Sequence, residues 1–318
     1  MKLSTTKLNI KTAKQLVVFA LCLLAGSGTV GFGLAKTVSA QSVSLSIWPP
    51  LIEAMMQPGR TIVAAYELTN NSEMDLLIVP NIYAFKPLGN SGKIKILDHQ
   101  PNDQSLSFFS IDSQEKFGEP FLLKIGEARQ IVLKIAIPEK NPERDYYHTL
   151  LFSTVGLPSL PGSSGDGGGA SSVTQIGSNI LLTVSQLGKP ILSGKINHFS
   201  VPKIIDSFDQ TPFTLILENT GQAFWKPFGA ITITGILKQK DEIKLLEQNV
   251  LAYNSRELTL EPYRPKLPLG PFKANLKFSL NENGPETTET ITFWYLPYKL
   301  FGLILVLTVF VIILKKSN

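Results

Sequence analysis

Near the carboxyl end of the chain, residues 300–314 carry a single polar side chain, Thr308. As a helix this run is about 22 Å long, which is short for a hydrocarbon core of about 30 Å. Counting from Phe293 gives 22 residues, or about 33 Å, which is enough to span with slight tilt. The pattern predicts a transmembrane helix over 296–314 and a cytoplasmic tail over 315–318. A buried core helix is the alternative.

Aromatic and basic residues border this run. Aromatic side chains favour the lipid–water boundary, and lysines next to a span stay on the cytoplasmic side. The predicted membrane-interface residues are Trp294, Tyr295, Tyr298, Lys299, Lys315 and Lys316. We therefore expect a single-pass plasma-membrane protein, bound to the lipid bilayer through this helix, whose amino-terminal part is extracellular.

The amino-terminal segment has the pattern of a secretory signal. A basic flank precedes the apolar residues 16–35, and Val38-Ser39-Ala40 then offers small residues at the spacing that a signal peptidase reads. We expect residues 1–40 to be a signal peptide, with an uncleaved membrane anchor as the alternative. Leu21 before Cys22 argues against a lipoprotein.

The positive charge of the chain lies in these terminal segments. The formal net charge is +5, but residues 41–298 hold 22 basic and 25 acidic residues. A nucleic-acid-binding domain needs a basic face on its folded part, so no nucleic-acid partner is expected. Cys22 is the only cysteine, and a cleaved product would therefore have no disulfide, zinc-thiolate site or cysteine nucleophile.

Between the two ends, short runs of alternating apolar residues recur, as is typical of antiparallel sandwiches. The clearest run extends from Phe272 to Leu280, with Lys273 and Lys277 on the opposite face. The pattern predicts an all-β fold of two tandem immunoglobulin-like β-sandwiches, at 41–190 and 195–294. The first sandwich would carry a flexible loop at 156–172, which holds six glycines and five serines.

Asp145 stands two residues before Tyr147 at the start of a predicted strand. This spacing fits the tyrosine corner of immunoglobulin-like sandwiches, in which the phenol bonds to backbone across the sandwich end. A plain strand start is the alternative, and either reading makes Asp145 and Tyr147 structural.

The order of these parts resembles the WxL-interacting surface proteins of Gram-positive bacteria, and the first sandwich resembles pilus chaperones more distantly. The residues that carry the resemblance are Pro58-Gly59-Arg60, Asn70-Asn71-Ser72, Arg144-Asp145-Tyr146-Tyr147, Glu218-Asn219-Thr220-Gly221, Gln248-Asn249-Val250-Leu251, Leu269-Gly270-Pro271-Phe272 and Phe293-Trp294-Tyr295-Leu296-Pro297. The resemblance implies a non-catalytic surface protein. Its first domain would associate with cell-wall polymer, and its second with host or partner proteins.

No cluster of reactive residues stands out in the sequence. His99, His148 and His198 are far apart, and none has a metal-ligand neighbour at close spacing. We expect no catalytic residue, no metal and no cofactor, and therefore not an enzyme. A hydrolase would need two carboxylates, or a Ser/His pair, converging on one pocket.

The candidate binding residues are Phe224, Trp225 and Trp48, because aromatic side chains near turns can stack on sugars or anchor a protein interface. Folding back onto the sandwich is the alternative for both tryptophans. The first hypothesis is a membrane-anchored surface protein that binds cell-wall polymer or other surface proteins. The second is a membrane-tethered assembly factor for exported subunits, which an unpaired hydrophobic strand edge on the first sandwich would favour.

Overall fold

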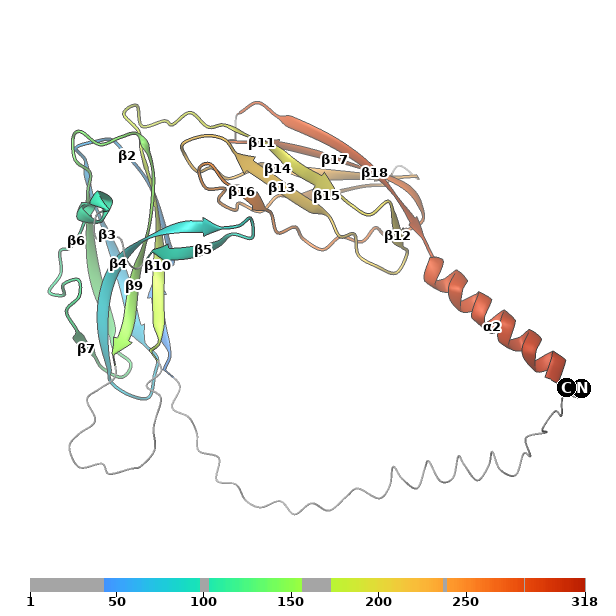
Figure 1. Cartoon of the computed structure of the whole chain (residues 1–318), viewed down its shortest axis with the longest axis horizontal. Coiled ribbons are helices and arrows are strands. Elements are labelled where there is room, and N and C mark those ends of the chain that lie inside the picture. Colours follow the sequence, from blue (N-terminus) through green and yellow to red (C-terminus); the bar gives the residue numbers. More distant parts are fainter. Residues whose placement is uncertain (1–42, 98–102, 156–172, 237–238, 283, 318) are drawn as a thin grey trace, which may run out of the picture. The chain divides into compact units, whose positions relative to one another are not determined.

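A computed structural model describes residues 43–97, 103–155, 173–236, 239–282 and 284–317. The predicted signal peptide and the glycine- and serine-rich loop at 156–172 lie outside these ranges. The described residues form two immunoglobulin-like β-sandwiches followed by a helix, which confirms the predicted all-β class (Figure 1).

The first sandwich packs a four-stranded sheet against a six-stranded sheet. The four-stranded sheet has the order β1 (Leu45–Trp48), β3 (Thr61–Asn70), β8 (Ala128–Ala136), β6 (Phe109–Ile111). The other has the order β2 (Leu51–Met56), β10 (Gln175–Val184), β9 (Arg144–Val155), β4 (Leu76–Leu88), β5 (Lys93–Leu97), with β7 (Phe121–Leu123) also paired to β4. A short 3-10 helix, η1 (Gln104–Phe108), precedes β6.

Two prolines divide the first strand of the sandwich between the sheets. β1 pairs antiparallel with β3 and ends at Trp48, and after Pro49 and Pro50 the chain continues as β2, parallel to β10. Proline lacks the backbone N–H that a ladder requires, so pairing with β3 stops here and the chain crosses to the other sheet.

The second sandwich repeats this plan. One sheet has the order β11 (Gly194–Ser200), β13 (Thr214–Asn219), β16 (Ser255–Glu257). The other has the order β12 (Ile204–Asp206), β18 (Thr287–Leu296), β17 (Gly270–Ser279), β14 (Phe228–Gly235), β15 (Lys240–Lys244). As β2 does with β10, β12 leaves the first sheet and pairs parallel with the last strand, β18.

Each core consists of the inward-facing residues of the two sheets. In the first sandwich, Ile131, Leu133 and Ile135 of β8 are fully buried. In the second, the alternating stripe predicted from the sequence is confirmed from Phe272 to Phe278, whose inward residues are at most 2% exposed. Burial of such side chains contributes about 25 cal/mol per Å² of apolar surface removed from water.

A buried asparagine ends β3, the third strand of the first sandwich. Asn70 is fully buried, and its Oδ1 accepts from Ser72 N at 2.9 Å. Its Nδ2 donates to the carbonyl oxygens of Met74 at 2.8 Å and Leu123 at 3.1 Å. The side chain thereby joins the turn after β3 to the end of β7. It supplies a donor to two carbonyl oxygens that have no partner in the sheets.

Asn219 occupies the equivalent place in the second sandwich. Its Oδ1 accepts from Gly221 N at 2.8 Å, and its Nδ2 donates to the carbonyls of Ala223 and Val250, both at 2.9 Å. The two sandwiches therefore share this connection as well as their strand plan.

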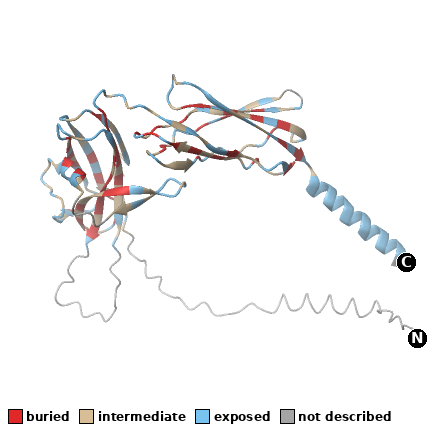
Figure 2. Ribbon diagram, turned by 45° about the horizontal axis from the view of Figure 1, so that its top comes forward, coloured by how far each residue is buried: buried red, intermediate tan, exposed pale blue. Residues whose placement is uncertain are grey.

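Helix α2 (Tyr298–Ser317) follows β18 after Pro297 alone. Its side chains from Tyr298 to Lys316 are exposed (Figure 2), and over those residues the mean hydropathy is 2.2, so that the helix is long and apolar enough to cross a membrane. It begins two residues after the predicted start at 296, because β18 continues to pair with β12 through Leu296.

We predict that Asn70→Ala lowers the free energy of unfolding by about 3 kcal/mol, since the carbonyls of Met74 and Leu123 would stay buried without their donor. Denaturant unfolding of the full chain in detergent measures this loss. Asn71→Ala is the matched control, because the Asn71 side chain is exposed and bonds only to Ser46 Oγ. Equal losses for the two variants would contradict the structural role of Asn70.

Candidate functional site

The predicted membrane-interface residues of β18 divide into two groups. Trp294 is 49% exposed, whereas Tyr295 is fully buried, stands against Phe272 and has its hydroxyl 2.5 Å from Thr211 Oγ1. Successive residues of a strand point to opposite faces, so these two neighbours cannot both face lipid. Trp294 remains available to the interface, and Tyr295 belongs to the core of the second sandwich.

The junction between β18 and α2 is held by two carboxylates, Asp206 at the end of β12 and Asp209 three residues later. Asp206 accepts from the backbone N of Lys299 at 2.8 Å, and thereby supplies a negative group at the amino-terminal end of the helix. Asp209 Oδ1 lies 2.5 Å from Lys299 Nζ. Within the helix, Phe301 N donates to Pro297 O at 3.1 Å. The helix therefore begins in direct contact with the sandwich.

The electrostatics of Asp206 agree with this role. Burial by itself would raise the pKa of its carboxyl, but the bonds from the backbone amides of Lys299 and Phe208, with the charge of Lys299, outweigh burial and lower it. The carboxylate is thus ionised at neutral pH, as stabilisation of a helix amino terminus requires. Tyr298, which opens the helix, is 48% exposed, and Lys315 and Lys316 are exposed at its other end.

The candidate binding residues lie in different environments. Trp225 is only 3% exposed and its Nε1 donates to Ser193 O at 3.2 Å, so it is part of the core. Gly194 makes room for it, because a Cβ there would lie 2.4 Å from Trp225 Cζ2. Phe224 is half-buried. Trp48 is 71% exposed, at the end of β1 opposite Glu67.

We expected the hydroxyl of Tyr147 to make the tyrosine-corner hydrogen bond to backbone. The structure shows that its neighbour, Tyr146, makes this bond. Tyr146 is 6% exposed, and its hydroxyl donates to Pro142 O at 3.4 Å and accepts from Asn141 Nδ2 at 2.8 Å. A buried tyrosine that bonds backbone a few residues upstream is the pattern of a tyrosine corner. The two tyrosines face opposite sides of β9, and the register of the strand decides which one turns inward.

Tyr147 and Asp145 instead contact residues of the second sandwich. The Tyr147 hydroxyl donates to Asp145 Oδ2 at 2.6 Å and accepts from Ala252 N at 2.8 Å. Asp145 Oδ2 also accepts from Phe224 N at 2.5 Å, and its Oδ1 accepts from Thr183 Oγ1 at 2.7 Å. Burial raises the pKa of Asp145, against these hydrogen bonds, which lower it. Asp145 and Tyr147 thus join β9 to residues 224 and 252, and the structural role expected of them stays a prediction.

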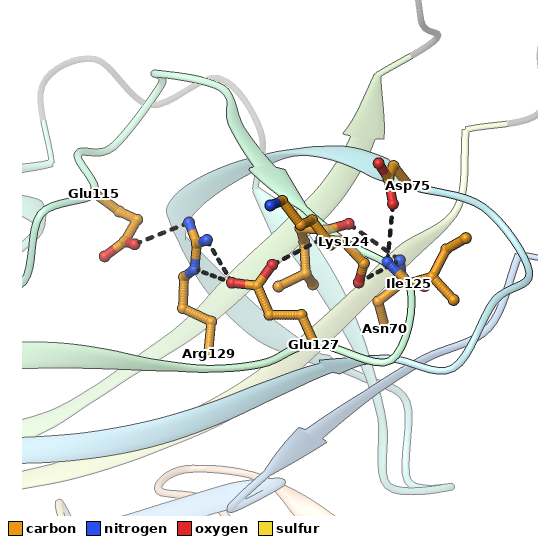
Figure 3. Close-up of polar contacts among 8 residues, drawn as sticks. Asn70, Asp75, Glu115, Lys124, Ile125, Glu127 and Arg129 are labelled. Atoms are coloured by element: carbon orange, nitrogen blue, oxygen red, sulfur yellow. Dashed lines mark hydrogen bonds and ion pairs between the residues drawn. The ribbon is translucent and has the colours of Figure 1, made fainter.

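The most prominent carboxylate pair has a structural geometry (Figure 3). Arg129 contacts Glu127 Oε1 through Nε at 2.9 Å and Glu115 Oε1 through Nη1 at 3.4 Å. The backbone N of Lys124 donates to Glu127, which with Arg129 lowers the pKa of that carboxyl. Glu127 is thus ion-paired with Arg129 and hydrogen-bonded to Lys124 N in the turn between β7 and β8.

Among the described residues, no group of three His, Cys, Asp or Glu side chains lies close enough together to hold a metal ion. His99 lies outside the described residues. The expected absence of catalysis stays a prediction.

A cavity of about 210 Å³ opens beside the β4–β5 hairpin, lined among others by Phe85, Gly92, Asn249 and Arg256. Arg256 donates through Nη1 to Asn249 O at 2.6 Å, and its Nε has no partner among the described residues. Gly92 permits this placement, because a Cβ there would lie 2.8 Å from Arg256 Nη2. The guanidinium therefore fills one wall of the cavity.

His148 is the one described histidine that lies in a core. It is 1% exposed, its Nε2 lies 2.9 Å from Ser105 Oγ, and Ser105 Oγ donates to Asp103 Oδ1 at 2.6 Å. Burial lowers the pKa of His148 to about 4, although the charge of Asp103 raises it. The imidazole is therefore neutral at pH 7 and connects β9 to η1.

We predict an acid-dependent loss of stability from His148. Between pH 6.5 and 4 the unfolded chain binds a proton at this site and the folded chain does not, so stability falls as the pH falls through this window, by at most roughly 3 kcal/mol. Denaturant unfolding at stepped pH should show a shallower acid slope for His148→Gln than for the parent chain. His198→Gln, at an exposed histidine, should keep the full slope, and an unchanged slope in the His148 variant would contradict the assignment.

Comparisons with known proteins give likenesses of fold only. No family model matches the sequence, and no curated protein matches it. Solved structures that match include a chaperone–tip adhesin complex of CFA/I fimbriae, with 13% identity, a TM-score of 0.42 and coverage of 78% of this chain and 98% of that chain. The class 5 fimbriae chaperone CfaA matches at 15% identity and a TM-score of 0.39, with 80% and 100% covered.

The CsuC–CsuE chaperone–tip adhesion subunit complex of Acinetobacter baumannii matches at 14% identity and a TM-score of 0.35, over 80% of this chain and 99% of that chain. These are pilus-chaperone folds, the kind that the first sandwich resembles distantly. TM-scores below 0.5 are too low for any function to be transferred. The resemblance to WxL-interacting proteins stays a prediction.

Proposed function

We propose that this chain is a membrane-anchored surface protein that displays two β-sandwiches outside the cell and binds cell-wall polymer or another surface protein. The observation that carries the proposal is the direct passage of β18 into α2, with Pro297 as the only residue between them. A core strand of the second sandwich thus continues into a helix that can cross a bilayer, and Asp206 and Asp209 fix its first turn.

The charge distribution supports an extracellular orientation of the sandwiches. Lys315 and Lys316 lie in the last turn of α2, where positive residues favour the cytoplasmic side. Residues 41–298 have a formal net charge of −3, which is compatible with export.

Trp48 is the candidate contact for the partner. It is the one predicted binding tryptophan that stands free of the core, and neighbouring outward positions on β3 are exposed as well. An exposed indole on a sheet face offers a flat stacking surface for a sugar ring or an anchor for a protein interface.

The membrane topology is tested with the full chain carrying an epitope after Asn318. External protease added to intact protoplasts should digest the sandwiches and leave a small, protected, epitope-bearing fragment. Leu305→Arg with Val309→Arg should expose the epitope, because each arginine at the centre of a span costs about 3 kcal/mol on insertion. Leu305→Ile with Val309→Leu is the control, and sandwiches protected from external protease would contradict the proposal.

A second candidate function is that of an assembly factor that pairs a strand with exported subunits. β2 pairs with β10 along one edge, and no other described strand pairs with it. Pro50 O accepts from Asn179 N of β10, and Met56 O accepts from Ser185 N, directly after β10. The even-numbered residues therefore face β10, and the backbone groups of the odd-numbered residues point outward. β2 contains no lysine and no proline, whereas the opposite edge strand, β5, carries Lys93 and Lys95. Unpaired backbone groups on a mostly apolar edge favour strand addition, and the one charged residue of β2, Glu53, is paired with Lys226 at 2.6 Å.

Two substitutions separate these candidates. If binding uses the exposed indole, Trp48→Ala should reduce co-sedimentation of the full chain with purified cell walls roughly tenfold, while Trp48→Phe retains most of it. If an added strand is the mode of binding, Met55→Pro should abolish partner crosslinking in cells by removing an outward N–H, while Met55→Leu preserves it. Unchanged binding in both Trp48→Ala and Met55→Pro would contradict both candidate surfaces.

A further inference from the structure

The outward face of the larger sheet of the second sandwich changes from polar to apolar next to α2. In one row across the neighbouring strands, Thr292 of β18 pairs with Lys273 of β17, and Lys273 pairs with Thr234 of β14. All three are exposed and polar. The same face farther from α2 continues with Thr290 and Asn275, which bond to each other at 3.2 Å.

The next row on this face is apolar. Trp294 lies opposite Pro271 on one side and Ile204 of β12 on the other. Beyond it, Leu296 ends β18, Leu269 immediately precedes β17, and Phe208 follows the cap residue Asp206. With Ile236, which directly follows β14 and lies near Gly270, these residues form what we call the apolar end: Ile204, Phe208, Ile236, Leu269, Trp294 and Leu296.

The side chains of the apolar end are exposed, and four of them are at least half exposed: Ile204, Phe208, Ile236 and Leu269. A contiguous apolar surface of this kind marks a contact with a partner or a membrane.

The position of the apolar end in the chain identifies the occupant. Leu296 stands four residues before Leu300, where the apolar run of α2 begins. Even a fully extended chain spans at most about 14 Å over four residues, and two of the four are already helical. The interfacial layer between hydrocarbon and water is about 5–8 Å thick on each side of a bilayer. The apolar end therefore lies next to the headgroup layer once α2 spans.

The charges beside the apolar end fit an anionic lipid surface. Lys203 immediately precedes Ile204, and both are exposed. The acids in this region are engaged within the protein, since Asp206 binds the first turn of α2 and Asp209 is paired with Lys299. A lysine beside exposed apolar side chains is the arrangement by which a surface enters the lipid–water interface.

We propose that the apolar end is a second membrane-binding surface, which inserts into the interface of the bilayer that α2 crosses and holds the second sandwich against it. This inference rests on the proposed membrane anchoring. Two attachments, a spanning helix and an inserted sheet end, would restrict the tilt of the sandwich more than a helix alone.

The test uses labelled full-length protein in vesicles of phosphatidylcholine and phosphatidylglycerol. The sequence holds one cysteine, Cys22, so Cys22→Ser gives a background for single labels. Fluorescent labels are attached at Ile204→Cys, Phe208→Cys and Leu269→Cys. Thr292→Cys and Thr234→Cys, one row away on the same face, are the matched controls, and Leu303→Cys in α2 reports the span. Quenching by lipid-borne nitroxides is compared with quenching by iodide in the buffer.

The proposal predicts that lipid-borne quencher acts at least threefold more strongly on the labels at 204, 208 and 269 than on those at 292 and 234, with iodide showing the reverse order. If the label at 303 is quenched by lipid but all five sandwich labels respond only to iodide, the inference fails and the membrane anchoring stands. Lack of lipid quenching at 303 means that the anchoring itself fails. Labels at 204, 208 and 269 shielded from both quenchers would show a protein cover and overturn the inference.

Discussion

The pairing of β18 with β17 and β12 is the interaction on which the arrangement of the second sandwich and the helix depends. The strand places Phe293 and Tyr295 in the core, and it is paired with β17 as far as Tyr295 and with β12 as far as Leu296. Two residues after Leu296 the chain is helical. Because the strand cannot shift register without exposing both aromatic side chains, the start of α2 is fixed relative to the sandwich.

The two sandwiches use the same devices. Each sends its second strand across to pair in parallel with its last strand, and each closes the turn after its third strand with a buried asparagine. Because both sandwiches share this plan, the plan reflects how two sheets bury their inner faces. It says little about which ligand the protein binds. The proposed functions therefore rest on exposed features, chiefly Trp48, the edge of β2 and the surface beside α2.

Much of the architecture could be predicted from local patterns. The alternating stripe from Phe272 onward, the apolar run of α2 and the proline pair after Trp48 act through period and backbone chemistry, which the sequence displays directly. Side-chain placement at strand ends was harder. Trp294 and Tyr295 read alike as interface aromatics, and only the register with β17 sends one outward and the other inward. Tyr146 and Tyr147 exchange roles for the same reason.

Contacts between distant segments left no signal in the sequence. Asp206 stands 93 residues before Lys299, whose amide it accepts, and nothing in its neighbourhood marks it as a helix cap. Asn70 and Asn219 were visible as turn residues, but their buried donors reach carbonyls that only the fold brings near. In the sequence, Trp225 has the pattern of an exposed loop aromatic. It is buried because Gly194, which has no Cβ, leaves space for its ring.

The central claim is that a strand continuous with a spanning helix keeps the second sandwich at the bilayer surface. Neutron reflectometry of the full chain in a supported bilayer measures this most directly. The account predicts protein density that begins within the headgroup layer, with no hydrated gap above it. A water layer thicker than the interfacial region, about 8 Å, between bilayer and sandwich would contradict it.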